Sequence, residues 1–276
     1  MNVNKEKINK IYRILLEDDI VDIANKHCNG GYPNPVDCAW YHGNWMLFRY
    51  LGLVSNPYWH EVFYMKALTN IVGSSDKKVL VAGTADFSMP LLCQEVGVSN
   101  ISVCDICDTP LIICKKASDL LNANWNVFNQ DVTVVSDTHY DVIVNDAFLS
   151  RFQEKQDVLT GISNLLLDEG YYITTLKKGS VNRGGEVSQE LKERFLNKAR
   201  ERYLSNIDVL PQVDIDDAIT TYVDRMSSYP IDSADSIINM FSSSNLKVVS
   251  LETGDVEGEY EASTYYRIIA KKINRL

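Results

Sequence analysis

A glycine turn and an aspartate about 20 positions after it are the residues whose spacing first points to chemistry. The turn, Gly83-Thr84-Ala85-Asp86, follows an apolar run at 79–82, and Asp105 ends a second apolar run at 101–104. Small residues let a backbone approach a ligand closely, and a carboxylate at a strand tip can accept hydrogen bonds from ribose hydroxyls. Because a helical segment separates the two runs, the stretch predicts a strand–helix–strand unit with a nucleotide site.

Further polar residues follow the next two predicted strands. Asp131-Val132 comes after a third strand at 125–128, and Asn145-Asp146 comes after a fourth at 140–144. Ligands of doubly wound α/β sheets bind outside the carboxyl ends of the strands, so these residues are expected at one site. His139 precedes the fourth strand and is therefore expected at the opposite edge, on the surface.

Residues 27–65 differ in composition from the rest of the chain, because they hold three of the four histidines and three of the four tryptophans. Asp37 is expected to cap a helix that runs to about Leu51, and the spacing of its aromatic and basic residues places four of them on one face. Two interpretations stay open: pure packing, or a wall or lid for a flat organic ligand. The four residues of this face are Tyr41, His42, Trp45 and Arg49.

The alternation of apolar strands and amphipathic helices predicts an α/β fold with a doubly wound, mostly parallel, seven-stranded sheet. We expect a helical N-terminal segment at 1–76, which begins with one helix over 5–26, and a main domain at 77–276. A polar, glycine-containing insertion at about 177–230 follows the fifth strand and is either a mobile cover or a surface or dimer element. A last helix and two closing strands complete the chain.

Composition narrows the class of partner. A net charge of −10 argues against nucleic acid and against an anionic membrane surface, both of which favour a basic face. No apolar run approaches the roughly 20 residues of a membrane helix, and the N-terminus lacks the apolar core of a signal peptide, so a cytoplasmic location is expected. Cys104-x-x-Cys107 has a spacing found in zinc and redox sites, but reduced core cysteines are the favoured interpretation, and no metal is expected.

The order of these features resembles class I S-adenosylmethionine-dependent methyltransferases over about Lys77 to Lys272. The resemblance implies S-adenosylmethionine as cofactor and S-adenosylhomocysteine as product, with the glycine turn at the methionine end, Asp105 on the ribose and Asp131 beside the adenine. Two departures stand out: Ala82 replaces an acid that the family usually has there, and Gly83 is the only glycine of the turn. The implied cofactor-binding residues are Gly83, Thr84, Ala85, Asp105, Ile106, Asp131, Val132, Asn145 and Asp146.

The expected reaction is in-line methyl transfer to an oxygen or nitrogen of a small, flat or aromatic molecule. Asp146 and His42 are the candidates for accepting a proton, although Asp146 could instead hold the cofactor and His42 could be a packing residue. The candidate substrate-binding residues are Tyr41, Trp45, Arg49, Phe148 and Arg151. Two alternatives remain, a non-catalytic binding or partner subunit with the same fold and a nicotinamide-dependent oxidoreductase, and a homodimer through the N-terminal helices is a further expectation.

Overall fold

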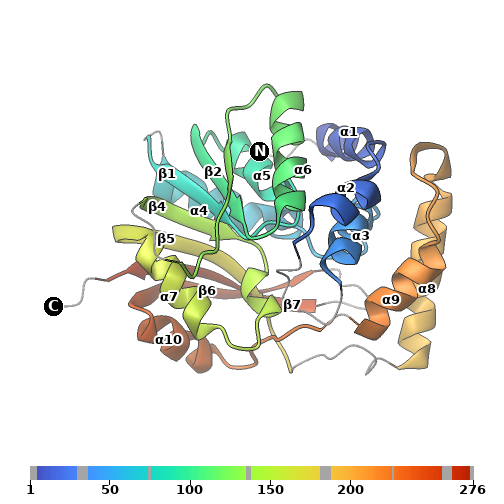
Figure 1. Cartoon of the computed structure of the whole chain (residues 1–276). Helices are drawn as coiled ribbons and strands as arrows, with labels where there is room; N and C mark the ends of the chain where they lie inside the picture. The colour runs from blue at the N-terminus through green and yellow to red at the C-terminus, as the bar shows by residue number, and fades with distance from the viewer. Residues whose placement is uncertain are drawn as a thin grey trace.

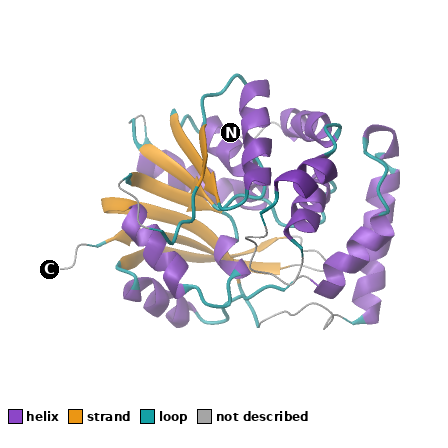
Figure 2. Ribbon diagram, in the orientation of Figure 1, coloured by secondary structure: helices purple, strands orange, loops and turns teal. Residues whose placement is uncertain are grey.

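The computed structural model describes residues 5–29, 37–73, 76–134, 138–180, 188–225, 227–256 and 263–273. Its centre is a seven-stranded sheet in the order β3-β2-β1-β4-β5-β7-β6, with helices on both faces (Figures 1 and 2). Strands β1 to β5 are parallel to one another, whereas β7 is antiparallel to both β5 and β6. The strands are β1 (Lys78–Ala82), β2 (Asn100–Asp105), β3 (Asn126–Asn129), β4 (Tyr140–Asn145), β5 (Leu166–Lys177), β6 (Leu246–Val256) and β7 (Ser263–Lys272).

This topology confirms the predicted mostly parallel sheet and the closing pair of strands. The central strand β1 is inaccessible to solvent from Val79 to Ala82, as expected for a strand covered on both faces. The chain leaves β1 toward β2 on one side and later returns to place β4 on the other side. This reversal opens a crevice at the carboxyl ends of the two strands.

Alternate residues of β1 supply two apolar cores. Val79 and Val81 belong to the larger core, which also contains residues of α1 to α6, α8 and α9. Leu80 and Ala82 belong to the second core, with residues of α7 and α10. The helices are α1 (Lys5–Leu16), α2 (Ile20–His27), α3 (Cys38–Tyr50), α4 (Glu61–Val72), α5 (Ser88–Glu95), α6 (Asp108–Leu120), α7 (Gln156–Leu165), α8 (Gln189–Leu204), α9 (Ile215–Arg225) and α10 (Ala234–Ser243).

The prediction of one helix over 5–26 is wrong, because the chain breaks between α1 and α2. Asp19 adopts a left-handed conformation with φ of 49°, and its side chain accepts a hydrogen bond from the backbone N–H of Asp22. The aspartate therefore starts a new helix where hydrophobic periodicity alone suggested continuation. The cap predicted at Asp37 is present and starts α3 by accepting from the N–H of Trp40.

The insertion after β5 packs on the N-terminal helices. Tyr222 of α9 lies 6.1 Å from the Trp45 ring and 5.7 Å from the Phe48 ring, measured between centroids. Arg202 of α8 donates hydrogen bonds to the carbonyls of Leu51 and Gly52. The pair α8 and α9 thus forms an outer layer over α3, and Figure 1 shows it at the side of the molecule away from α7 and α10. Within the described part of the chain, no helix combines the length and apolar character needed to cross a bilayer.

Gly161 gives a test of the close packing between α7 and the loop after β3. A Cβ atom at this position would lie 2.1 Å from the backbone oxygen of Val132, so Gly161→Ala must displace the loop. We expect it to lower the free energy of unfolding by about 1–2 kcal/mol, measured by urea denaturation. Gly43→Ala in α3 is the matched control: its Cβ would make only ordinary contact, 3.4 Å from Val21 Cα, and the change should cost nothing. Equal stabilities of the two variants would contradict the packing argument.

Candidate active site

A cavity of about 290 Å³ lies at the carboxyl ends of β1, β2 and β4, between the sheet and α3. All the site residues proposed from the sequence line it, whether they come from the N-terminal segment or from the main domain. Their individual roles remain predictions. The lining residues proposed from the sequence are Tyr41, His42, Trp45, Arg49, Gly83, Thr84, Ala85, Asp105, Ile106, Asp131, Val132, Asn145, Asp146, Phe148 and Arg151.

The glycine turn lies at the floor of this cavity. Gly83 has φ of 69°, a conformation that side chains disfavour, and its N–H donates to the carbonyl of Cys104. A Cβ atom here would lie 2.1 Å from the ring of Phe148, so only glycine allows this close contact. The hydroxyl of Thr84 donates to the backbone oxygen of Asp86 at 2.5 Å, which closes the turn.

Asp105 is held at the tip of β2 by two backbone donors. Its Oδ2 accepts from the N–H of Thr84 at 3.1 Å and its Oδ1 accepts from the N–H of Cys107 at 2.8 Å. Burial raises the pKa of this carboxyl to about 6. The group therefore lies between the glycine turn and the loop before α6, at the end of a strand that borders the cavity.

A second carboxylate, that of Asp86 in the glycine turn, is fully buried and was not proposed as a site residue from the sequence. Its Oδ1 accepts from Arg49 Nη1 at 2.8 Å, and its Oδ2 accepts from the hydroxyl of Tyr12 at 3.0 Å. Ser88 at the start of α5 also donates to Oδ1 through its N–H and its hydroxyl. Burial lowers the pKa of Arg49, but Asp86 together with Tyr12, Asp146 and Tyr41 outweighs this effect and raises the pKa overall. Arg49 thus has a structural partner, although it still lines the cavity.

Asn145 ends β4 and Asp146 follows it, and each presents a polar atom that lacks a partner among the described residues. Oδ1 of Asp146 accepts from the hydroxyls of Thr175 at 2.7 Å and Tyr64 at 3.1 Å, whereas its buried Oδ2 has no hydrogen bond there. The amide oxygen of Asn145 accepts from Tyr172 and Thr174, which leaves its Nδ2 without an acceptor in the same part of the chain. Buried polar atoms of this kind favour a bound polar ligand.

Aromatic rings from α3 and from the segment after β4 line the cavity. The rings of Tyr41 and Trp45 lie 4.8 Å apart between centroids, and Phe148 and Phe152 form a second pair at 4.9 Å. The guanidinium of Arg151 lies 4.8 Å from the Trp45 centroid. Such a wall suits a flat ligand, and the cation also suits one that carries negative charge.

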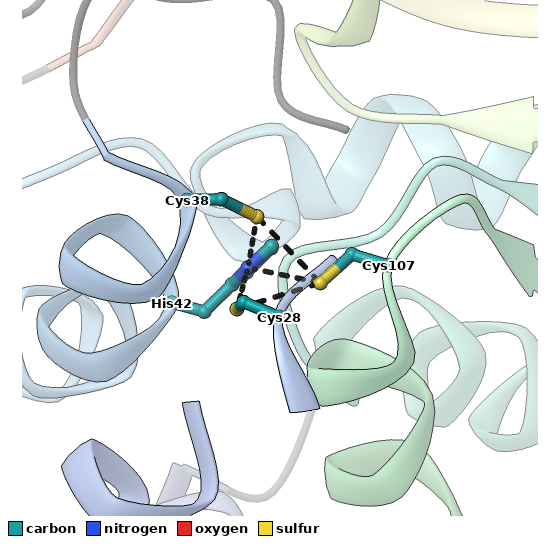
Figure 3. Close-up of side chains that lie close together, drawn as sticks. All are labelled: Cys28, Cys38, His42 and Cys107. Carbon is teal, nitrogen blue, oxygen red and sulfur yellow. Dashed lines mark hydrogen bonds between the residues drawn. The ribbon is translucent and has the colours of Figure 1, made fainter. Parts of the chain in front are cut away.

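One feature of the site was missed from the sequence. Cys28, Cys38, His42 and Cys107 place their donor atoms within 4.8 Å of one another, and two of them, His42 and Cys107, line the cavity (Figure 3). Cys107 therefore belongs to this group rather than to a pair with Cys104, which is buried in β2 in the second core. The local signal was Cys38-x-x-x-His42, since residues four apart share one face of a helix.

Comparison with proteins of known structure identifies the fold. No protein-family model and no curated protein matches the sequence. An S-adenosylmethionine-dependent methyltransferase from Methanosarcina mazei superposes with a TM-score of 0.52 at 13% identity, over 76% of this chain and 98% of that chain. One from Clostridium acetobutylicum gives 0.52 at 8% identity, over 80% and 93%. The YcgJ protein of Bacillus subtilis gives 0.51 at 10% identity, over 78% and 99%. The chain thus has the fold of the class I S-adenosylmethionine-dependent methyltransferases.

Proposed function

We propose that this protein is an S-adenosylmethionine-dependent methyltransferase that acts on a small, flat molecule, at oxygen or nitrogen. The observation that carries the proposal is the position of Asp105. Two backbone N–H groups fix its carboxylate beside the glycine turn, at the floor of a cavity that lies where this fold places its ligands.

The residues of the cavity fit this cofactor. The Asp105 carboxylate suits two ribose hydroxyls, and the loop of Asp131 and Val132 suits the adenine. The Nδ2 of Asn145, a hydrogen-bond donor without a partner among the described residues, suits the carboxylate of the methionine end. Bound here, S-adenosylmethionine would supply an electrophilic methyl group.

The chain's own contribution is to hold the acceptor in line and to take up its proton. Tyr41 and Trp45 would orient a flat acceptor, and the cavity volume of about 290 Å³ favours a small molecule. We assign the proton to Oδ2 of Asp146, because this atom is buried and without a partner among the described residues, while Oδ1 is fixed by Thr175 and Tyr64. An Asp146→Asn variant that methylates at the wild-type rate would contradict this role.

The experiment is calorimetric titration of the purified chain with S-adenosylmethionine and, separately, with S-adenosylhomocysteine. The proposal expects one site per chain and micromolar affinity for both, followed by a screen of flat hydroxyl- and amine-bearing acceptors for methylated product. Absence of binding to either compound would overturn it. Binding with no product from any acceptor would favour the non-catalytic alternative, a binding or partner subunit on the same fold.

A further inference from the structure

Three cysteines and one histidine converge from three separate segments beside the cavity (Figure 3). Cys28 follows the end of α2, Cys38 and His42 lie one turn apart at the start of α3, and Cys107 lies in the loop between β2 and α6. Cys38, His42 and Cys107 are at most 4% exposed. The group has sulfur and nitrogen donors only, which is the ligand chemistry of zinc rather than of magnesium or calcium.

Five of the six distances within the group match the edges of a tetrahedron of ligands, and the sixth, between the sulfurs of Cys28 and Cys38, is no more than 4.8 Å. Around zinc, with bonds of about 2.3 Å to sulfur and about 2.0 Å to nitrogen, two sulfurs lie about 3.8 Å apart and a sulfur and a nitrogen about 3.5 Å apart. The Sγ atom of Cys107 lies 3.7 Å from that of Cys38 and 3.5 Å from that of Cys28. His42 Nδ1 lies 3.3 Å from the sulfur of Cys28 and 3.5 Å from those of Cys38 and Cys107.

A neighbouring hydroxyl completes the pattern. Oγ1 of the buried Thr109 lies 3.2 Å from the sulfur of Cys28, so it can donate a hydrogen bond to a thiolate there. Outer partners of this kind orient metal ligands and tune their charge. A disulfide is the competing use of paired cysteines, but sulfurs joined in one lie about 2.05 Å apart, and a disulfide gives no role to His42.

We propose that Cys28, Cys38, His42 and Cys107 bind one zinc ion, which fastens the N-terminal helices to the loop that follows Asp105. Four protein ligands leave no open position, so the site is structural. Its link to the cofactor runs through Cys107, whose N–H donates to Oδ1 of Asp105, and this last step rests on the proposed function. His42 is then a zinc ligand rather than a proton acceptor. The proposal also replaces the expectation that the protein binds no metal.

The direct test is the metal content of the full-length chain, purified without chelators and measured by inductively coupled plasma mass spectrometry. We expect about one zinc per chain in the wild type. The zinc content should fall tenfold or more in Cys38→Ser and in Cys107→Ser. Cys93→Ser and Cys114→Ser are the matched controls, because both thiols are fully buried but lie outside the group, and they should keep the metal. Zinc retained by both ligand variants would overturn the proposal.

A second measurement uses the wild-type chain and so does not depend on the variants folding. The metal is removed under reducing conditions and replaced by Co²⁺, which should give the strong visible bands of tetrahedral cobalt and a thiolate charge-transfer band. Absence of both zinc uptake and these bands would overturn the proposal. A native disulfide between members of the group, seen as the loss of two hydrogens in the intact mass, would also overturn it.

The link to the cofactor has its own readout. Zinc-depleted chain that is still folded, as judged by circular dichroism, should bind S-adenosylhomocysteine about tenfold more weakly than the zinc-loaded chain. Unchanged affinity would overturn the link to Asp105. Zinc bound at one per chain with no cofactor affinity would overturn the proposed function and leave the metal site in place, so the two failures are distinguishable.

Discussion

Replacing Arg49 by methionine is expected to lower the free energy of unfolding by about 3–5 kcal/mol, because it leaves a charged carboxylate buried without its cation. The side chains of Arg49 and Asp86 are 7% and 0% exposed, and their atoms lie 2.8 Å apart. Tyr12 and Ser88 would still donate hydrogen bonds to the carboxylate, but neither carries the opposite charge. Guanidinium chloride denaturation, followed by circular dichroism, measures the loss.

The chain supplies a matched control on its surface. Arg200 and Asp216 form a two-point ion pair at 2.6 and 2.7 Å, with side chains 44% and 49% exposed. Arg200→Met should therefore cost less than about 1 kcal/mol, since water replaces the lost partner. A double variant, Arg49→Met with Asp86→Asn, should recover part of the stability, because it removes the uncompensated charge. Similar losses at Arg49 and Arg200 would contradict the argument.

The ion pair of Arg49 and Asp86 also helps to hold the glycine turn, which contains a single glycine. Three further positions, Thr84, Ala85 and Asp86, complete the turn. The hydroxyl of Thr84 and the carboxylate of Asp86 tie it to its own backbone and to α5, and the carboxylate also binds side chains of α1 and α3. None of these three residues has a positive φ, so the turn needs glycine only at position 83, and hydrogen bonds that include donors from the N-terminal segment hold it in place.

The sheet and the cavity could be predicted because their signals are local. Each parallel strand is a short apolar run, and the rule that ligands bind at the carboxyl ends then selected Asp105, Asp131 and Asn145 together. The same rule placed His139 at the opposite edge, and it is exposed in the structure. These inferences need only the order of elements, which the alternating pattern provides.

The partners of the buried polar groups could not be predicted in this way. Cys107 meets Cys28 across 79 positions, and Arg49 meets Asp86 across 37, so neither pair leaves a spacing that can be recognised. Cys104-x-x-Cys107 suggested a pair, but β2 buries Cys104 while Cys107 lies beyond the strand, in the loop before α6. Tertiary packing of α2 and α3 on that loop decides which cysteines meet.

Asp105→Ala is expected to weaken binding of S-adenosylmethionine and S-adenosylhomocysteine about 30- to 150-fold, or about 2–3 kcal/mol. The physical reason is the loss of two charge-assisted hydrogen bonds to the ribose hydroxyls. The backbone donors of Thr84 and Cys107 would also lose their acceptor, so the loop could relax. Isothermal titration calorimetry gives the affinity, and a thermal melt establishes that the variant is folded.

Asp108→Ala is the control for this experiment. Asp108 begins α6 three positions after Asp105, but it is exposed and does not line the cavity. Its replacement removes a hydrogen bond from Asn129. It also removes one negative charge, as Asp105→Ala does, so any general electrostatic effect appears in both variants. Only the Asp105 variant should lose cofactor affinity by more than about threefold, because electrostatic effects of exposed groups are small. A folded Asp105→Ala chain with unchanged affinity would remove this carboxylate from the site, and with it the observation on which the proposed function rests.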